Sequence, residues 1–484
     1  MRWWDARARA HAALLSAHAA AVGATADDGP LRWGAWSGAA LLAGLVLRPP
    51  GGVRAGSDPL LLGEIPCRSE GFLVGRGYEW TSAAAQEALE QGRAAPRPEG
   101  DLVLPASLFE QHVLILGTTG TGKTRLLELL ALQAVARGET TVVIDPKGDD
   151  GLETRIRRAA GDRFRLFSLP HPRRSVRYNP IGRYRDVREV ADRIAALLPS
   201  SGDALPFRNF GWEIVHTAAR EMHGRTPMTL RNLKRAAIDR PVGPLAARPR
   251  EHYLKTASAL IPVLSKLATD QLSPEDGGLT WEAADEGRWA VYFSLGSLLG
   301  YETASAVAKM ALLDLQSYVG GRYAYAKGRT PMWLFVDELG DVATPELVNL
   351  LNKSRGAGLR VVACGQTAAD LEAALGSRAR ALQALGNANT VFQFRAQSAP
   401  DAEVFARMAG ERLLRTRSEG AAYEPALLGS GFRTVDDFRA RFSESFEWRD
   451  RPLVPPAALV ELPRFHYFAR WEGRVYRGRT ALVS

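Results

Sequence analysis

The stretch LILGTTGTGKTRLLE, residues 114–128, decides the fold of this chain. Its middle matches the phosphate-loop pattern GxxxxGK[ST] in full, after an apolar strand at His112–Leu116 and before a helix at Lys123–Ala136. The glycines let successive backbone N–H groups point at a polyphosphate, and the positive dipole end of the helix adds to the attraction. Lys123 is expected to reach the β- and γ-phosphates, and Thr124 to ligate Mg²⁺. The loop consists of Gly117, Thr118, Thr119, Gly120, Thr121, Gly122, Lys123 and Thr124.

An α/β pattern extends along most of the chain. Further strands are predicted at 140–144, 163–168, 289–296, 333–338, 359–365 and 390–396, and helical periodicity alone fills about 186–280. The pattern predicts a P-loop NTPase domain with a parallel-rich sheet, interrupted by an all-α domain. The expected parts are an anchor-like, membrane-proximal segment 1–56, a linker or pre-domain 57–105, nucleotide-binding parts 106–185 and 281–484, and the all-α insertion 186–280. The second part ends in a hairpin that turns at Glu472-Gly473.

A phosphate loop needs a carboxylate on a neighbouring strand to hold magnesium through water, and two aspartates compete for this role. Asp145 ends the run VVID, and Asp337 ends WLFVDE. Asp337 is favoured because Glu338 follows it directly, and a carboxylate beside the γ-phosphate can polarise the attacking water. Gln366 ends the next strand, where it can sense the γ-phosphate or position water. Asp-Glu followed by Gln in this order is typical of a RecA-like motor core.

The stretch VVIDPKGDD, residues 142–150, then takes another interpretation. Asp145 is expected to orient the turn after its strand. Lys147 and Asp149 are expected near the nucleotide or a neighbouring subunit.

The composition is that of a globular protein of more than one domain, with 484 residues, 46% hydrophobic and 24% charged. Lysine and arginine exceed the acids by nine, which favours a polyanionic partner such as nucleic acid or an anionic lipid surface. Cys67 and Cys364 lie far apart without a CxxC neighbour. This argues against a structural zinc site and fits a reducing, cytoplasmic setting.

Residues 33–47, WGAWSGAALLAGLVL, are uncharged and mostly apolar, and they lie between Arg32 and Arg48. A spanning helix needs roughly twenty such residues, so this segment is short for that role. The flanking arginines and the two tryptophans suit a membrane boundary. A short span, an interfacial anchor and a buried helix all stay open.

The densest basic run is RFRLFSLPHPRRSVRYNPIGRYR, residues 163–185. Its arginines and aromatic residues suit DNA contact without sequence preference. Phe164 and Phe167 fit a core-facing strand better, and a solvated loop or a subunit interface competes with DNA for the whole run. No recognition-helix or zinc-finger pattern is present, so sequence-specific readout is not expected. A second basic face consists of Arg231, Lys234, Arg235 and Arg240.

Six ordered motifs together resemble the conjugative coupling proteins of type IV secretion. They are LILGTTGTGKTRLLE, VVIDPKGDDGL, YNPIG, FVDELGD, NKSRGAGLRVVACGQ and GNANTVFQFR. More narrowly, GRGYEWTSAAAQ at 75–86 and VPPAALVELPRFHYF at 454–468 are similar to the TraD-type factors of integrating conjugative elements. The resemblance covers most of residues 70–484.

This resemblance implies a hexameric RecA-fold ATPase, related to the FtsK and HerA DNA pumps, on the cytoplasmic face of the bacterial inner membrane. Such a protein links a DNA–relaxase complex, the relaxosome, to the secretion channel and drives transfer with ATP and Mg²⁺. The resemblance assigns Asp337 with Thr124 to the metal side. It assigns the catalytic roles to Lys123, Glu338, Gln366 and Arg355.

Arg355 matches an arginine proposed to reach the nucleotide of the neighbouring subunit, where it would stabilise transition-state charge in trans. The all-α insertion matches a domain implicated in cargo or relaxase contact. The chain departs from the family in its N-terminal region, because the family has clear transmembrane helices and this sequence has one short apolar segment. Two rival functions remain: a cytoplasmic FtsK/HerA-like DNA pump, and a docking protein that binds ATP and recruits cargo without pumping.

Overall fold

The computed structural model describes residues 60–92, 95, 97–199, 205–325, 330–343, 348, 351, 357–386, 388–425 and 438–483. By its contacts, Pro59–Ser484 forms one compact unit. The apolar segment 33–47 lies outside the described residues, so its three alternatives stay predictions. No helix within the described ranges is both long and apolar enough to cross a membrane.

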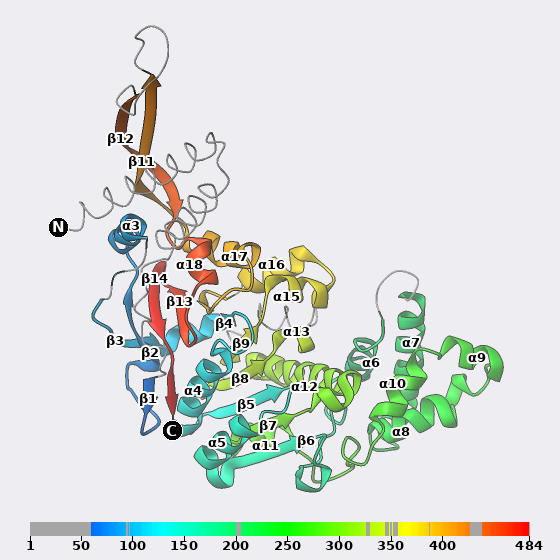
Figure 1. Ribbon diagram of the computed structural model, residues 1–484. Coiled ribbons are helices and arrows are strands. Elements are labelled where there is room, and N and C mark those ends of the chain that lie inside the picture. The colour runs from blue at the N-terminus through cyan, green and yellow to red at the C-terminus, as the bar shows by residue number, and fades with distance from the viewer. Residues whose placement is uncertain are drawn as a thin grey trace, which may run out of the picture. The chain divides into compact units, whose positions relative to one another are not determined.

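An 11-stranded sheet runs through this unit (Figure 1). Seven neighbouring strands are parallel, in the order β10-β4-β9-β8-β5-β7-β6. They read as near-continuous apolar runs because helices bury both faces of the sheet. This confirms the predicted α/β class with a parallel-rich sheet. The strands are β4 (Val113–Leu116), β5 (Thr140–Asp145), β6 (Phe164–Ser168), β7 (Ala290–Ser294), β8 (Met332–Asp337), β9 (Leu359–Gly365) and β10 (Thr390–Gln393).

Four antiparallel strands extend the sheet beyond β10. They are β13 (His466–Trp471), β14 (Arg474–Arg479), β2 (Gly71–Glu79) and β3 (Gly100–Pro105). The predicted turn of the hairpin is confirmed, with Glu472 and Gly473 both at positive φ, as tight hairpin turns require. The boundary expected at residue 105 does not separate two folding units, because β2 and β3 pair into the same sheet. β1 (Leu60–Leu62) and β15 (Ala481–Val483) form a small separate sheet.

Alternate residues of the parallel strands enter two cores, one on each face of the sheet. On one face lie α4 (Lys123–Ala136) and α5 (Asp150–Ala160). α4 is apolar nearly all round and its residues from Leu126 to Val135 are buried, as expected of a helix packed on several sides. The other face is covered by α12 (Ser297–Tyr325), α11 (Trp281–Glu286), α15 (Ala368–Leu375) and α17 (Ala399–Ala409). Shorter or peripheral helices are α3 (Ser82–Gln91), α13 (Leu339–Val342), α16 (Arg378–Gly386) and α18 (Pro456–Val460).

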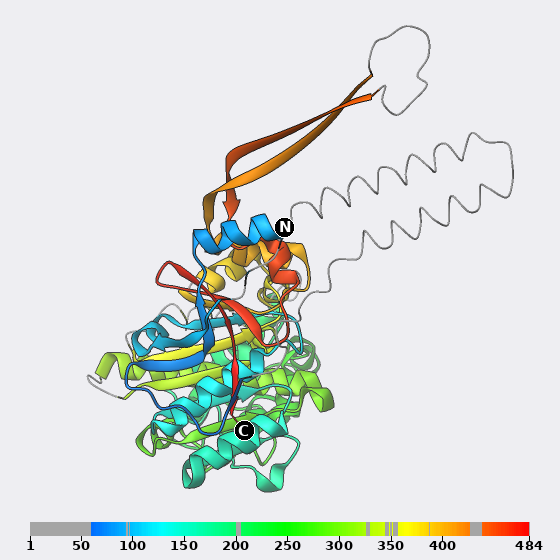
Figure 2. The same ribbon diagram turned by 60° about the vertical axis from the view of Figure 1, so that its left-hand side comes forward.

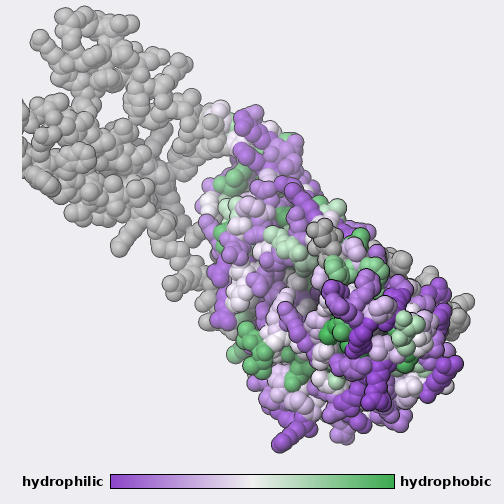
Figure 3. Space-filling model, turned by 90° about the vertical axis from the view of Figure 1, so that its right-hand side faces the viewer, coloured by the Kyte–Doolittle hydropathy of each residue, from purple (hydrophilic) through white to green (hydrophobic). Residues whose placement is uncertain are grey.

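The described regular elements between Val187 and Leu267 are helical, as the periodicity over about 186–280 predicts. Their face in Figure 3 is largely hydrophilic. The helices are α6 (Val187–Ala195), α7 (Leu205–Met222), α8 (Leu230–Lys234), α9 (Arg250–Thr256) and α10 (Leu260–Leu267), with a π-helical turn at Arg235–Asp239.

A long hairpin, β11 (Glu411–Pro425) and β12 (Phe438–Pro452), forms its own two-stranded sheet apart from the main one (Figure 2). Near its base, Arg415 forms an ion pair with Glu90 of α3. No strand was expected in either segment.

A buried polar cluster joins the all-α insertion to the nucleotide-binding core. The carboxylate of Asp314 on α12 pairs with Arg193 of α6 at 3.0 Å. It also accepts hydrogen bonds of 2.7 Å from the Tyr178 hydroxyl and from the Trp281 indole N–H. Burial raises the pKa of Asp314 to about 6, against the opposing effect of Arg193.

We expect Asp314→Ala to lower the free energy of unfolding by about 3–5 kcal/mol, because the buried Arg193 charge then keeps, of its described carboxylate contacts, only the longer one with Glu189 at 3.5 Å. Denaturant titration followed by circular dichroism measures the change. The matched control is Asp270→Ala, which removes an aspartate from an exposed pair with Arg231 and should cost about 1 kcal/mol or less. Equal losses in the two variants would contradict a structural role for this cluster.

Candidate nucleotide site

The phosphate loop joins β4 to α4 through three glycines at positive φ, Gly117, Gly120 and Gly122. Two of them also have no room for a side chain. A Cβ on Gly117 would lie 2.7 Å from the Cβ of Phe394, and one on Gly122 would lie 2.9 Å from the ring of Phe465. These positions therefore require glycine for both backbone conformation and space.

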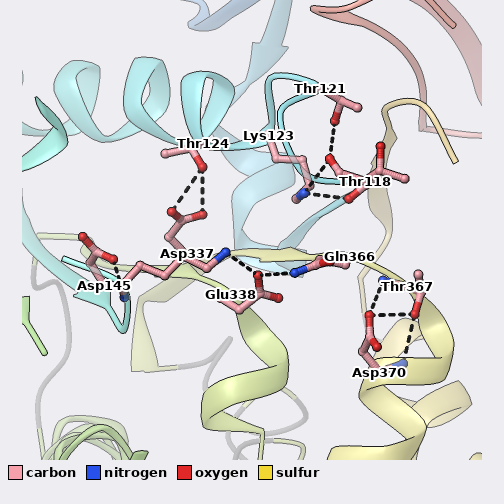
Figure 4. Close-up of polar contacts among 12 residues, drawn as sticks. Thr118, Thr121, Lys123, Thr124, Asp145, Asp337, Glu338, Gln366, Thr367 and Asp370 are labelled. Atoms are coloured by element: carbon pink, nitrogen blue, oxygen red, sulfur yellow. Dashed lines mark hydrogen bonds and ion pairs between the residues drawn. The ribbon is translucent and has the colours of Figure 1, made fainter. Parts of the chain in front are cut away.

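Lys123 lies inside the curve of the loop (Figure 4). Its ammonium donates to the carbonyl oxygens of Gly117 at 2.6 Å and Thr118 at 3.0 Å, and burial lowers its pKa. The N-cap of α4 is Gly122, which offers no side-chain acceptor to the first-turn N–H groups. A lysine ammonium beside uncapped N–H groups at a helix N-terminus fits an anionic phosphate.

Thr124 and Asp337 meet although 213 residues separate them in sequence. The Thr124 hydroxyl donates to the two carboxylate oxygens of Asp337 at 3.2 and 3.1 Å. Burial raises the pKa of Asp337 to about 6, and the charge of Asp145 adds to the shift. A hydroxyl and a carboxylate are the hard oxygen donors that Mg²⁺ prefers, so the pair fits this ion. The described residues contain no group of three or more His, Cys, Asp or Glu side chains that could hold a metal, so water and phosphate oxygens would complete the shell.

Glu338 follows β8 and is nearly buried, at 8% exposure. Its backbone has φ 96° and ψ 81°, a left-handed conformation that is uncommon for a residue with a side chain. Gln366, directly after β9, donates its amide to Glu338 Oε2 at 2.9 Å. The strand order explains the meeting, because β9 lies between β4 and β8 and brings Gln366 between the phosphate loop and Glu338.

Asp145 is fully buried and its carboxylate is used within its own turn. It accepts from the backbone N–H groups of Lys147, Gly148 and Asp149 at 2.9, 2.9 and 2.5 Å, and from the Tyr292 hydroxyl at 2.6 Å. The prediction that Asp145 orients the turn is confirmed. Asp149 caps α5 by accepting from the N–H groups of Gly151 and Leu152.

Lys147 lies at the candidate nucleotide site, which agrees with the first of the two positions expected for it. Its ammonium forms an ion pair with Glu338 Oε2 at 2.9 Å. Burial alone would lower its pKa, but the hydrogen bond and charge of Glu338 outweigh this effect and raise it. Burial also raises the pKa of the nearby Asp341, and the charge of Glu338 adds to the shift. Both residues belong to quoted motifs, Lys147 to VVIDPKGDDGL and Asp341 to FVDELGD, but the motifs alone do not show that Lys147 pairs with Glu338.

Three further predictions concern Arg355, the basic run 163–185 and the second basic face. Arg355 lies outside the described residues, so its role stays a prediction. In the basic run, Phe164, Phe167 and Tyr178 are buried, so these rings are not available for stacking on bases. In the second basic face, Arg231 and Lys234 pair with Asp270 and Asp239.

Two family models match the chain. Residues 98–257 match the type IV secretion-system coupling protein DNA-binding domain, and residues 331–464 match the TraM recognition site of TraD and TraG. Together the two matched segments span more than half of the chain. A search of curated protein sequences gives no match.

Solved structures share the fold at low sequence identity. The plasmid coupling protein TrwB in complex with ADP and Mg²⁺ is 17% identical, with a TM-score of 0.61 over 87% of this chain and 97% of that one. TrwB with the non-hydrolysable ATP analogue ADPNP is 16% identical, with a TM-score of 0.58 over 87% and 100%. VirB4 of Thermoanaerobacter pseudethanolicus is 12% identical, with a TM-score of 0.51 over 86% and 97%.

The shared fold agrees with the RecA-like core and the all-α insertion that the sequence predicts. The two family models match in the order of the chain, one across the phosphate loop and the other across Asp337, Glu338 and Gln366. The chain therefore belongs to the TraD/TraG-type coupling proteins of type IV secretion systems.

Proposed function

We propose that this coupling protein hydrolyses Mg-ATP and uses the energy to drive DNA transfer in conjugation. The observation that carries the proposal is the meeting of Lys123, Thr124, Asp337, Glu338 and Gln366 at the carboxyl ends of β4, β8 and β9. The TrwB structures of the same fold contain ADP with Mg²⁺ or an ATP analogue.

Different residues of the site bind the phosphates, hold the metal and activate water. The loop N–H groups and Lys123 hold the phosphates, and Thr124 and Asp337 hold the metal side. Bound Mg²⁺ supplies charge neutralisation on the phosphate oxygens. Glu338 accepts a proton from the attacking water, and Gln366 restrains the Glu338 carboxylate.

Assembly and partners belong to the same proposal. A homo-hexamer would let Arg355 act on the neighbouring subunit's nucleotide. DNA and relaxosome proteins are the proposed cargo, in line with the descriptions of the two matched models. Arg231, Lys234, Arg235 and Arg240 line a hollow of about 460 Å³ together with Asp239, and their excess positive charge suits DNA phosphates. The proposed further partners are the channel components of the secretion system, and the proposed location is the cytoplasmic face of the inner membrane.

Phosphate release by the full-length chain, measured alone and with single- or double-stranded DNA of unrelated sequences, tests this function. A DNA-driven motor should turn over faster with DNA, and the stimulation should weaken as salt rises because phosphate contacts are screened. A chain that binds ATP without turnover would instead be a docking protein. Stimulation by DNA without any transfer defect in a deletion strain would favour a cytoplasmic pump.

Magnesium dependence gives a sharper prediction for Asp337. The Asp337→Asn variant should need about 10–100 times more Mg²⁺ for half-maximal turnover, the usual loss when a group that orients metal-bound water is removed. In the wild type this requirement should rise as pH falls through about 6, because the raised pKa leaves Asp337 protonated there. Magnesium titrations at several pH values measure both effects. An unchanged Mg²⁺ requirement in Asp337→Asn would show that Asp337 does not help to hold the metal.

A further inference from the structure

Lys147 is outside the phosphate loop, yet it lies against the proposed general base. Its ammonium donates to Oε2 of Glu338 at 2.9 Å. The amide of Gln366 donates to the same oxygen at 2.9 Å (Figure 4). The two donors come from the strands on either side of β8, because Lys147 follows β5 and Gln366 follows β9. No group in the described part of the chain donates a hydrogen bond to the second oxygen, Oε1.

The carboxylate of Asp145 fixes the loop that carries Lys147. Asp145 is fully buried, and its carboxylate accepts hydrogen bonds from the backbone N–H groups of Lys147, Gly148 and Asp149. The hydroxyl of Tyr292, on β7, donates a further hydrogen bond to this carboxylate. The lysine backbone therefore has a defined position, although half of its side chain is exposed. An ordinary surface lysine has no such anchoring.

Glu338 needs restraint from its surroundings. Its left-handed backbone costs about 1–3 kcal/mol for a residue with a side chain and persists only where neighbouring groups determine it. Two donors on one oxygen fix the orientation of the carboxylate and direct the other oxygen away from them. An exposed ion pair with no further role would contribute little to stability or to turnover.

We propose that Lys147 is a positioning residue for Glu338, which it holds together with Gln366 so that Oε1 is presented to the attacking water. This proposal rests on the proposed ATP hydrolysis. The proposal gives the turn DPKG a role, because Asp145 fixes the backbone of the loop and the loop fixes the position of Lys147. Loss of Lys147 would leave the carboxylate with one donor, free to rotate away from its working orientation.

The test compares steady-state ATP turnover by full-length wild type, Lys147→Met and Lys147→Arg. We expect Lys147→Met to lower kcat about 10–100-fold, as a displacement of about 1 Å does to an oriented group, with KM nearly unchanged. Lys147→Arg keeps a charged donor and should recover most of the lost kcat. The matched control is Lys255→Met, which removes an exposed lysine from a surface pair with Glu251 and should leave both constants unchanged.

Each other outcome overturns the proposal. A Lys147→Met variant with wild-type kcat removes the positioning role, and a raised KM with unchanged kcat makes Lys147 a nucleotide-binding residue instead. Failure of Lys147→Arg to recover turnover would show that a charged donor is not what the site needs. A wild-type chain without turnover would overturn the proposed function, and this proposal with it. Thermal melts and fluorescent-nucleotide binding establish that each variant is folded.

Discussion

Lys123→Ala is expected to lower ATP turnover about 100- to 1,000-fold, the loss typical of removing one preorganised charged donor from a water-poor site. Lys123 is buried at 8% exposure and is held by the carbonyl oxygens of Gly117 and Thr118, inside the curve of the loop. Nucleotide affinity should fall as well, since this ammonium contributes to binding phosphates before any chemistry. Phosphate release and equilibrium binding of a fluorescent ATP analogue measure the two effects.

The control for this variant is Lys255→Ala, because Lys255 lies on the exposed side of α9, where it pairs with Glu251. It should bind and hydrolyse ATP as the wild type does. The substitution at 123 should not unfold the chain, since burial already disfavours the lysine charge. Wild-type turnover in a folded Lys123→Ala variant would rule out the loop as the phosphate site.

Glu338→Gln is expected to behave differently, with nucleotide binding retained and turnover lowered about 100- to 10,000-fold, the range for removing a general base. The amide has the size of the carboxylate and can still accept a hydrogen bond from Gln366, but it cannot take a proton from water. The folded variant should therefore bind ATP and hold it. Single-turnover phosphate release, alongside the binding assay, separates this result from that of Lys123→Ala.

Glu251→Gln supplies the control, because Glu251 is an exposed glutamate in a surface pair. If Glu338→Gln hydrolysed ATP at the wild-type rate, another group would have to activate water. If it failed to bind nucleotide, Glu338 would act in binding and not in proton transfer.

Local patterns predicted much of the secondary structure around the site. The helix bounds Lys123–Ala136 agree with the structure, as do the strand Leu359–Gly365 and the turn at Glu472-Gly473. These features depend on neighbours a few residues apart, such as glycines at positive φ and apolar spacing. The sequence motif also ranked Asp337 above Asp145, and the hydrogen bonds within the Asp145 turn explain that ranking physically.

The hairpin β13–β14 was predicted, but the pairing of the antiparallel strands into the main sheet and the hairpin β11–β12 were not foreseen. β2 pairs with β14, whose residues follow it by about four hundred positions, and no local pattern encodes such a partner. The strand β11 lacks sustained apolar alternation. In contrast, β12 has apolar residues at alternate positions, a strand pattern that was overlooked: Phe438, Ala440, Phe442, Phe446 and Trp448.

The sequence by itself determined that the chain has a phosphate loop, a RecA-like α/β core, an all-α insertion and the motifs of a coupling protein. Only the tertiary structure decided which side chains meet. Thr124 reaches Asp337 across 213 residues, and Lys147 reaches Glu338 across 191. The reason is strand order: β9 lies between β4 and β8, and β5 lies beyond β8. Strand order depends on which long-range pairings bury most apolar surface, and short sequence patterns do not carry that information.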